Sequence, residues 1–496
     1  MNSYKEYKNQ MQRIADVNYS SALLSWDQET YMPEGGAELR ARQQSTLAGI
    51  SHDMFTAESL GKLLDQLEND ASLDERQKAN VMQTIKDYRK AKKYTRVFVE
   101  EMSQSISEAF NAWQEAKSKN DFSLFAPKLK KLVELKRKEC EMLGYKEYAY
   151  DSLLDLHEPG LTTKEVEALF DEVRASLVPF VKSIAAKPLH STALLHHSYS
   201  KTAQWDFSVH VLKAMQFDFK YGRQDISVHP FTINFGAQDV RVTTRIDEHN
   251  LSDCVTGTIH ESGHALYEQG LPASEYGLPS GEAVSLGIHE SQSRLWENNV
   301  GRSFAFWKGQ FTVLQKHFPE QLKNSTAQDI FSAINVVQPS FVRINADELT
   351  YHFHIMIRFE VEKALFEKEI EVEDIPAFWN QRYKDYLGID VPSAAEGCLQ
   401  DVHWSHGSFG YFPTYSLGSF YAAQFFNKAK KDIPTLEKEI EEGNYSSLLK
   451  WLRENIHQHG KRYEAKELCE RVTGEKLSFS YFMEYAKEKY GLLYGI

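Results

Sequence analysis

Apolar side chains recur every three to four residues along most of this 496-residue sequence, and that spacing is typical of amphipathic helices. In residues 122–144 apolar positions with this spacing are Phe125, Leu129, Leu132, Cys140 and Leu143. Gly144 marks the expected end of this helix, and Thr162 with Glu165 predicts a capping box at the start of another. The chain is therefore expected to fold mainly into α-helices.

The clear exception is the stretch HPFTINFGAQDVRVTTRID, residues 229–247. Apolar and polar residues alternate from Phe231 to Phe235 and from Val240 to Thr243, which predicts a small antiparallel hairpin. The polar face of the second strand could border a cleft, where a sheet edge can pair with an extended peptide. A plain amphipathic strand explains the same spacing equally well.

The sequence HESGH at residues 260–264 places two histidines four residues apart. On a helix His260 and His264 share one face and can reach one metal ion, while Glu261 lies about 100° round and can face a water on that ion. The alternative is an accidental pair of exposed helical histidines. Ser252 as a cap and Gly270 as a stop favour a real helix. The buried side of that helix is expected to hold Val255, Ile259 and Leu266.

A catalytic zinc site needs three protein ligands and an open position, so a third ligand is expected downstream. A motif with Gly and His at the third and sixth places after the second His fails, because Tyr267 and Gly270 occupy those places. A carboxylate from a helix predicted over 282–298 is expected instead. Glu290 is the first choice, and Glu282 is the competitor, although the helix dipole also explains an acid at that helix start.

The same predicted helix has further polar residues. Arg294 and Glu297 share a face with Glu290. His289 is expected to point elsewhere and to serve as a core residue or as a support for the ligands. Imidazole and carboxylate ligands suit Zn²⁺, but they also accept Co²⁺ or Mn²⁺.

Composition limits the setting of such a site. The net charge of −13 opposes binding to nucleic acid or to an anionic membrane, whose phosphates a basic face would have to neutralise. The sequence has no signal-peptide pattern and no run of about 18 apolar residues, so a cytoplasmic, soluble protein is expected. The four cysteines are far apart and are expected to be reduced core residues.

No repeat or proline-rich linker divides the chain. The segment 187–204 is the nearest thing to a long connection. We therefore expect one domain over residues 1–496.

Five motifs, in this order, resemble those of the carboxypeptidase Taq family of zinc metallocarboxypeptidases. They are DVRVT at 239–243, HESGH at 260–264, HESQ at 289–292, VRINAD at 342–347 and GCLQDVHW at 397–404. The resemblance extends from LLSWDQETYMP at 23–33 to the C-terminal helices. The family usually has Ile where this chain has Val342, which is a conservative difference.

The resemblance implies His260, His264 and Glu290 as metal ligands and Glu261 as the catalytic base. It also implies a mainly helical metallopeptidase fold with a deep substrate groove, a homodimer, and removal of single residues from peptide C-termini. In such a fold the N-terminal helices, about 1–200, would form one wall or lid of the groove. Residues 201–496 would carry the metal site.

An enzyme that acts at a C-terminus must recognise a carboxylate, and a guanidinium pairs with it most directionally. Arg343 is the main candidate, just before Asn345, which with Glu348 is expected to cap a long helix. The alternative is a structural pair between Arg343 and Asp347.

Other residues are weaker candidates for contacts with the substrate. They are Asp239, Arg241, Arg294 and His229. By resemblance to helical zinc peptidases, His403 and Tyr415 are expected to flank the scissile carbonyl, with Tyr411 in reserve.

The expected chemistry is hydrolysis of peptides with a free C-terminus, with Glu261 moving the proton and His403 and Tyr415 stabilising the oxyanion. An oligoendopeptidase with the same metal core is the first alternative. A noncatalytic scaffold with a structural metal is the second, but it would need a fourth protein ligand, and none stands out in the sequence.

Overall fold

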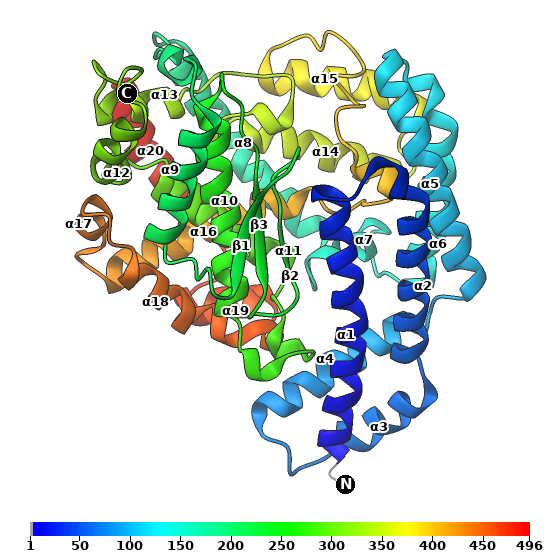
Figure 1. Ribbon diagram of the computed structural model, residues 1–496. Coiled ribbons are helices and arrows are strands. Elements are labelled where there is room, and N and C mark those ends of the chain that lie inside the picture. The colour runs from blue at the N-terminus through cyan, green and yellow to red at the C-terminus, as the bar shows by residue number, and fades with distance from the viewer. Residues whose placement is uncertain (1–2) are drawn as a thin grey trace. The chain divides into compact units, whose positions relative to one another are not determined.

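The computed structural model describes residues 3–496, which form two compact units (Figure 1). Unit 1 comprises Met1–Ala91, His190–Ile334 and Tyr421–Leu477, and unit 2 comprises Lys92–Leu189, Asn335–Phe420 and Ser478–Ile496. One boundary falls within the connection 187–204. The expected single domain over 1–496, with its division near residue 200, stays a prediction.

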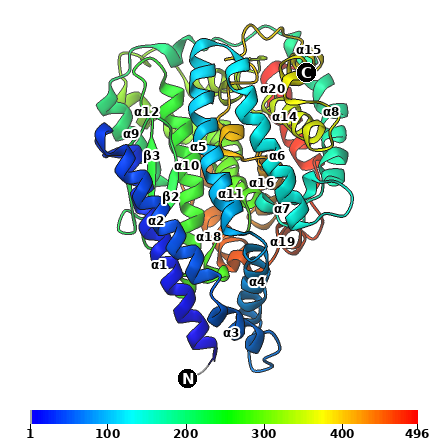
Figure 2. The same ribbon diagram turned by 90° about the vertical axis from the view of Figure 1, so that its right-hand side faces the viewer.

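Unit 1 holds the N-terminal helices and the segment with HESGH. Its helices are α1 (Ser3–Thr30), α2 (Ala37–Phe55), α3 (Glu58–Glu68), α4 (Glu75–Ala91), α9 (Lys201–Ala214), α10 (Leu251–Gly270), α11 (Leu286–Arg294), α12 (Phe304–His317), α13 (Ala327–Ile334), α17 (Leu436–Glu441), α18 (Ser446–Asn455) and α19 (Ala465–Thr473). A π-helix, Leu295–Gly301, continues α11. In both ribbon views α1 and α2 lie side by side (Figures 1 and 2).

Unit 2 holds the segments with VRINAD and QDVHW. Its helices are α5 (Arg96–Lys119), α6 (Ala126–Leu143), α7 (Tyr150–His157), α8 (Thr163–Ala185), α14 (Tyr351–Phe366), α15 (Ile375–Leu387) and α20 (Ser480–Tyr494). Short 3-10 helices cover Arg343–Asn345 and His403–His406. Helix α16, Pro413–Asp432, contains the unit boundary between residues 420 and 421.

Two helix ends that the sequence predicts are present in the structure. The capping box of Thr162 and Glu165 at the start of α8 is confirmed. Helix α6 ends at Leu143, and Gly144 follows with a φ of 81°, which favours glycine. Nearly every residue of α14 is buried, so α14 is a core helix of unit 2. The mainly helical fold class is therefore confirmed.

The sheet of unit 1 has three strands in the order β1 (Gly222–Ile226), β3 (Val240–Thr244) and β2 (Thr232–Asn234). The predicted antiparallel hairpin of β2 and β3 is confirmed, but β1 pairs in parallel with β3, so the small sheet is mixed and not wholly antiparallel as expected. Strand β1 was missed because its sequence, GRQDI, does not alternate. Since β3 has partners on both sides, it has no edge for an added peptide strand.

The core of unit 1 beside the N-terminus forms where α1, α3 and α4 meet. It contains Tyr7, Met11, Ile14, Leu60, Leu63, Leu64, Leu67, Leu73, Val81, Ile85 and Leu278. Tyr7 is fully buried, and its hydroxyl lies 2.7 Å from the Thr84 hydroxyl, so its polar end is satisfied.

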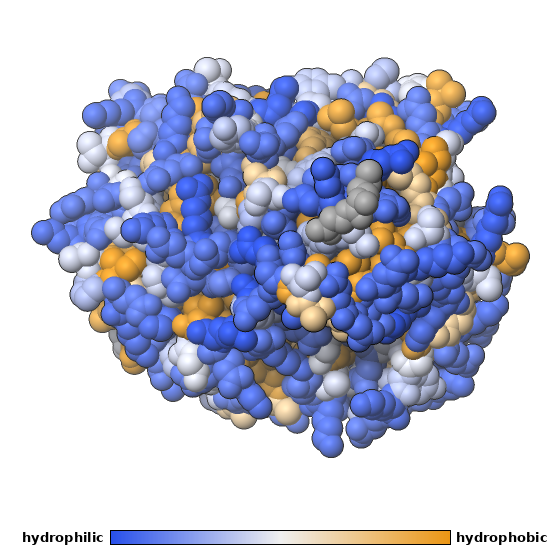
Figure 3. Space-filling view, turned by 90° about the horizontal axis from the view of Figure 1, so that it is seen from below, coloured by the Kyte–Doolittle hydropathy of each residue, from blue (hydrophilic) through white to orange (hydrophobic). Residues whose placement is uncertain are grey.

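The surface agrees with the high share of charged residues, which make up 26% of the chain. The face seen in Figure 3 is mostly hydrophilic, with apolar side chains in small separate groups. Within residues 3–496, no helix combines the length and the apolarity that crossing a bilayer requires. The four cysteines are unpaired and buried, which confirms that they are core residues.

Candidate active site

Helix α10 carries HESGH and packs against β3 and α11 (Figure 1). Its N-cap is Asn250, whose side chain accepts a hydrogen bond from Ser252 N at 3.2 Å. The expected cap, Ser252, instead lies in the first turn, because Asn250 has the extended backbone that a cap needs. The predicted end at Gly270 is confirmed. The expected apolar stripe of Val255, Ile259 and Leu266 is buried.

Three side chains of α10 and α11 bring their metal-binding atoms together: His260, His264 and Glu290. One such atom from each residue lies within 4.8 Å of the other two. Glu290 Oε2 is 3.4 Å from His264 Nε2 and 3.8 Å from His260 Nε2. Ligands about 2 Å from one zinc ion lie about 3–4 Å apart, so the cluster has the dimensions of a metal site. The residues chosen from the sequence thus meet in space.

The two helices approach closely because residue 263 has no side chain. A Cβ on Gly263 would lie 2.5 Å from the Gln292 carbonyl oxygen and 2.6 Å from Ser293 Cα. Real contacts are not that short, so a larger residue would force α11 away from α10. Because this contact is within one turn of Glu290, Gly263 sets the distance between Glu290 and the two histidines. Gly263 lies within the metal motif, but its spacing there gives no sign of this packing role.

Each histidine is held through the ring nitrogen that faces away from Glu290. His260 Nδ1 lies 2.9 Å from Glu297 Oε2. A carboxylate in this position fixes the ring and its tautomer and leaves Nε2 as the ligand atom. Burial alone would lower the pKa of His260, but Glu290 and Glu297 raise it above its ordinary value. Glu297 lies on the π-helix, a distortion often found at functional sites.

His264 is supported through a second histidine. His289 Nε2 donates to Glu268 Oε1 at 2.7 Å, which leaves His289 Nδ1 as an acceptor. His264 Nδ1 contacts that nitrogen and therefore donates to it, so His264 Nε2 is free of hydrogen and can bind a metal. Burial lowers the pKa of His264 to about 3, with His289 and His260 adding to the effect, so the ring is neutral. This agrees with the expected supporting role of His289.

Two arginines balance part of the negative charge. Arg294 Nε donates to Glu290 Oε1 at 2.6 Å, and its NH1 donates to Glu297 at 3.2 Å. Arg302 donates to Glu297 at 3.1 Å. Burial would raise the pKa of Glu290, but Arg294 and the two histidines lower it well below its ordinary value. Arg294, a weaker candidate for substrate binding, thus orients the carboxylate of the cluster.

Glu261 is buried next to the cluster and is held from the sheet. Thr232 of β2 donates its hydroxyl hydrogen bond to Glu261 Oε2 at 2.7 Å, and the same hydroxyl lies 2.9 Å from the Glu261 carbonyl oxygen. Burial raises the pKa of Glu261, although His260 and Thr232 oppose this. A raised pKa suits a carboxylate that must accept and then release a proton.

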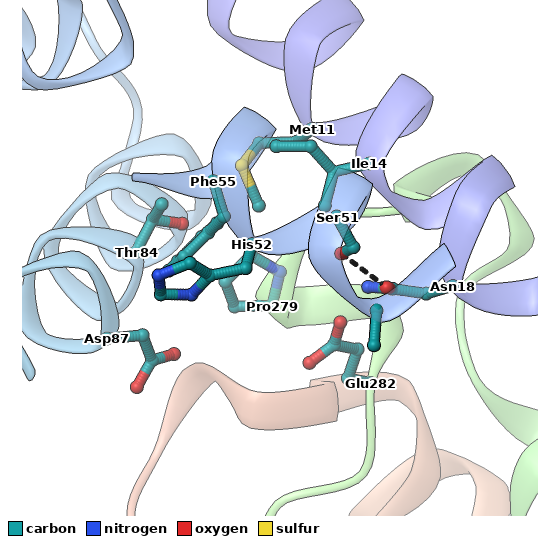
Figure 4. Close-up of a pocket in the computed structure, with 11 residues that line it drawn as sticks. Met11, Ile14, Asn18, Ser51, His52, Phe55, Thr84, Asp87, Pro279 and Glu282 are labelled. Carbon is teal, nitrogen blue, oxygen red and sulfur yellow. Dashed lines mark hydrogen bonds between the residues drawn. The ribbon is translucent and has the colours of Figure 1, made fainter. Parts of the chain in front are cut away.

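The rival carboxylate, Glu282, lies in the connection before α11 and is exposed. The expected helix over 282–298 starts only at Leu286, because Ser285 caps it. Glu282 lines a separate hollow of about 460 Å³ between α1, α2 and α4. Figure 4 shows its carboxyl group with Asp87 and His52 around this hollow. Glu282 is not among the residues of the metal cluster.

The first motif of the resemblance, DVRVT, connects the sheet to the N-terminal helix. Asp239 and Arg241 form an ion pair with two contacts of 2.9 Å. The Arg241 guanidinium lies 4.4 Å from the Trp26 ring centre and 4.8 Å from that of Phe235. These contacts give both charged residues a structural role. His229 is exposed, and its carbonyl accepts a hydrogen bond from the Ser227 hydroxyl at 2.6 Å.

In unit 2, Arg343 is buried and is bound by the distant Asp401 and by the nearby Tyr351. Its Nε donates to Asp401 Oδ1 at 3.0 Å, and its NH1 donates to the Tyr351 hydroxyl at 3.0 Å. Arg358 donates to Asp401 Oδ2 at 2.6 Å. The alternative partner, Asp347, is wrong, because Asp347 accepts from the backbone and hydroxyl of Thr350.

The expected cap by Asn345 and Glu348 was also wrong. Helix α14 begins at Tyr351, and Glu348 is buried, where it accepts hydrogen bonds from Lys489 and Tyr490. Asp347 provides the turn before the helix. The pattern at Asn345 and Glu348 therefore resembles a capping box, although Glu348 binds Lys489 and Tyr490 and not a helix start.

His403 and Tyr415 of unit 2 lie together, with His403 Nε2 3.2 Å from the Tyr415 hydroxyl. The Tyr411 ring contacts both, at centroid distances of 5.3 Å and 5.2 Å. Burial lowers the pKa of His403 to about 3, while Asp401 opposes this and Arg343 reinforces it. His403 is therefore neutral near pH 7. The Arg343 guanidinium lies 5.0 Å from the Tyr415 ring centre.

The donor set of unit 1 suits a divalent ion. Two imidazoles present Nε2 atoms whose partner nitrogens are already bound, and one carboxylate completes three ligands. Three such ligands with an open position are the arrangement of catalytic zinc, and imidazole with carboxylate also accepts cobalt or manganese. Which metal is bound stays a prediction.

A mainly helical chain that joins an H-E-x-x-H helix to a glutamate on the next helix falls in the class of metallopeptidases. The family model of carboxypeptidase Taq (M32) metallopeptidases matches residues 6–490. The chain belongs to this family, and it is a metallocarboxypeptidase. The resemblance inferred from the five motifs is confirmed.

Individual relatives agree over the whole length. Carboxypeptidase 1 of Bacillus subtilis is 41% identical over 494 residues, which are 99% of this chain and 98% of the relative. Thermostable carboxypeptidase 1 of Thermus thermophilus is 40% identical over 506 residues, with 99% of each chain covered. The crystal structure of an M32 carboxypeptidase from Deinococcus radiodurans has a TM-score of 0.98 at 39% identity and covers 100% of both chains.

Proposed function

We propose that this metallocarboxypeptidase releases single amino acids from the C-termini of peptides, with a divalent ion, most simply Zn²⁺, held by His260, His264 and Glu290. The observation that carries the proposal is the convergence of their three ligand atoms within 4.8 Å. When bound, such an ion supplies Lewis acidity for water and for a substrate carbonyl. The residues of the chain supply binding, orientation and proton transfer.

Glu261 is the proposed general base. Its buried carboxylate, held by Thr232, accepts the proton of the attacking water and passes it to the departing amine. Burial raises the pKa of Glu261, which makes this carboxylate a better proton acceptor.

The arginine cluster of unit 2, Arg343, Arg358 and Asp401, is the proposed site for the terminal carboxylate. Two guanidiniums share one carboxylate there, so the cluster keeps a positive charge. A buried positive charge attracts a carboxylate strongly, and a guanidinium orients it. This support favours an exopeptidase over the oligoendopeptidase alternative.

His403 and Tyr415 are the proposed donors to the oxyanion, with Tyr411 as the substitute for Tyr415. The neutral state of His403 supports this role, because a neutral imidazole can donate one hydrogen bond without bringing a charge. Asp239, Arg241 and His229 remain weaker proposals for substrate contacts.

A time course on matched peptides with free and amidated C-termini, followed by mass spectrometry, tests the function. We expect stepwise loss of single C-terminal residues from free peptides, and no reaction after chelation of the metal. Internal cleavage of amidated peptides would instead show an oligoendopeptidase.

Two variants test the residue roles in the same assay. Glu261→Gln should retain the metal and lose turnover by about 100-fold or more, as expected for a general base. Near wild-type activity would exclude Glu261 as the base.

Arg343→Ala should mainly reduce cleavage of free peptides, and equal loss on all substrates would contradict a carboxylate-binding role.

Assembly and location belong to the same proposal. The family resemblance supports a homodimer, and the acidic composition supports a cytoplasmic protein that binds neither nucleic acid nor membranes. Light scattering of the purified protein checks the dimer.

A further inference from the structure

A buried carboxylate of unit 2 binds the residue that follows His403 and has no part in the mechanism above. Glu362 of α14 is 0% exposed. It accepts hydrogen bonds from the Tyr150 hydroxyl at 2.6 Å, from Trp404 Nε1 at 2.7 Å and from Gly410 N at 2.8 Å. Donors from α7 and from the segment 403–411 therefore meet on one side chain.

Two of the three donors belong to the segment 403–411. Trp404 directly follows His403, and Gly410 directly precedes Tyr411. Glu362 thus binds the segment next to each of these two residues, at both of its ends.

The local backbone is built for this contact. Gly410 has a φ of 82°, and a Cβ there would lie 2.5 Å from the Leu153 carbonyl. Only glycine fits this conformation and this close approach to α7. The Trp404 indole also packs against Phe409 and Trp379. The bond from Gly410 N to Glu362 is therefore part of a closely packed turn.

We infer that Glu362 is a positioning residue, which fixes the segment 403–411 so that His403 and the tyrosines beside it are correctly placed for the reaction. The inference rests on the proposed role of His403. Glu362 itself is buried beneath that segment and acts only through it.

A carboxylate is the side chain that this position needs. Its two oxygens can accept all three hydrogen bonds, whereas a glutamine would turn an NH₂ group toward at least one donor. Burial raises the pKa of Glu362 to about 7, although the three hydrogen bonds and Arg358 oppose this. Keeping an acid in such a place is costly, and acids of this kind concentrate at functional sites.

The main test is Glu362→Gln in the metal-loaded enzyme. We expect kcat to fall on the order of 10- to 100-fold, because small displacements of catalytic groups have effects of this size, while KM changes less than about twofold. Metal content should not change. A wild-type kcat would overturn the inference, as would a loss that appears only in KM.

A matched control separates positioning from general stability. Glu348 is also a buried carboxylate of unit 2, but its donors are Lys489 and Tyr490. Glu348→Gln should lower the unfolding midpoint and leave kcat within about twofold of wild type, because it does not bind the segment 403–411. If both variants lose kcat in proportion to their loss of stability, Glu362 is only structural.

A double-mutant cycle with His403→Ala distinguishes the inference from the proposed function. If Glu362 acts through His403, adding Glu362→Gln to His403→Ala should cause little further loss of kcat. Fully multiplicative losses would overturn the inference. Full activity of His403→Ala alone would instead refute the proposed role of His403. Should Glu362→Gln fail to fold, Tyr150→Phe removes one donor and should lower kcat by about threefold.

Discussion

The histidine–carboxylate cluster of unit 1 and the arginine cluster of unit 2 have opposite charge balances. The histidine–carboxylate cluster of unit 1 contains four carboxylates and two guanidiniums around its imidazoles; these are Glu261, Glu268, Glu290 and Glu297 with Arg294 and Arg302. The arginine cluster of unit 2 contains two guanidiniums, Arg343 and Arg358, and one carboxylate, Asp401. Four minus two leaves excess negative charge in the first, and two minus one leaves excess positive charge in the second.

This difference shows how one rule produces two kinds of site. Buried charges must be paired, and in both clusters the pairing is incomplete. The excess charge of each cluster decides which ligand it favours. The negative excess in unit 1 favours a cation, and the positive excess in unit 2 favours an anion. Four substitutions would break or sharpen the comparison.

Replacing Glu290 by Gln should have the largest effect. Among the described residues, Glu290 is the only member of the metal cluster that comes from α11. Its loss should lower metal affinity by more than about 100-fold, which exceeds the loss expected when a residue that supports a ligand is altered. Metal content after dialysis and peptidase activity measure this. The matched control is Glu282→Gln, which should keep the metal. Retention of metal by Glu290→Gln and loss by Glu282→Gln would reverse the assignment.

Asp401→Asn should be the most damaging change in the arginine cluster. It leaves two buried guanidiniums without a carboxylate, and such losses destabilise proteins by about 3–5 kcal/mol. Urea unfolding measures the free energy. Asp171→Asn, in an ion pair whose acid side chain is 71% exposed, should cost less than about 1 kcal/mol. Equal losses in the two variants would contradict the buried pairing of Asp401.

Glu268→Gln tests the support of His264 through His289. Without the carboxylate, the tautomer of His289 is no longer fixed, and metal affinity should fall about 10- to 100-fold. Competition with a chelator measures the affinity. Glu275→Gln removes a carboxylate that instead binds Asn80 and should leave the affinity unchanged. An unchanged affinity in Glu268→Gln would show that the hydrogen-bond chain does not matter.

The smallest effect is expected from the titration of His403. Its pKa is about 3 in the folded protein and about 6.5 when unfolded, so the folded state binds fewer protons between these values. Its stabilising contribution is therefore complete above pH 6.5 and is lost as the pH falls toward 3.

His403→Gln should accordingly reduce the pH slope of the unfolding free energy between pH 6 and 4 by up to about 1.4 kcal/mol per pH unit. His249→Gln, at an exposed position, is the control. An identical slope in the His403 variant and the wild type would show that His403 is protonated in the folded protein.

The sequence predicted what helical spacing determines. His260 and His264 share a face because they are four residues apart. Glu290 was predicted because a zinc site needs a third ligand, and the separation from His264 is long enough for a second helix to pack against the first. The supports at Glu268 and Glu297 were not assigned. Glu297 was seen on the face of Glu290, but its contact with His260 depends on the π-helix, which spacing alone does not reveal.

Contacts between distant segments were the least predictable. The partner of Arg343, Asp401, is 58 residues away, whereas the sequence suggested only the nearby acid Asp347. Strand β1 pairs in parallel with β3, so no turn between them signals the pairing. Glu362 was missed because its three donors, Tyr150, Trp404 and Gly410, lie 212, 42 and 48 residues away along the chain.

The bare backbone contact at Gly263 has a consequence for how the enzyme acquires its ion. The backbone of α10 at Gly263 lies directly against the backbone of α11 at Gln292 and Ser293. No side chain lies between the two helices there, so no change of rotamer can alter their separation. The distance between Glu290 and the two histidines is therefore fixed when the protein folds. It does not have to change each time an ion binds. An enzyme stripped of its cation should regain activity at the speed of diffusion and desolvation, without a slow rearrangement of the protein.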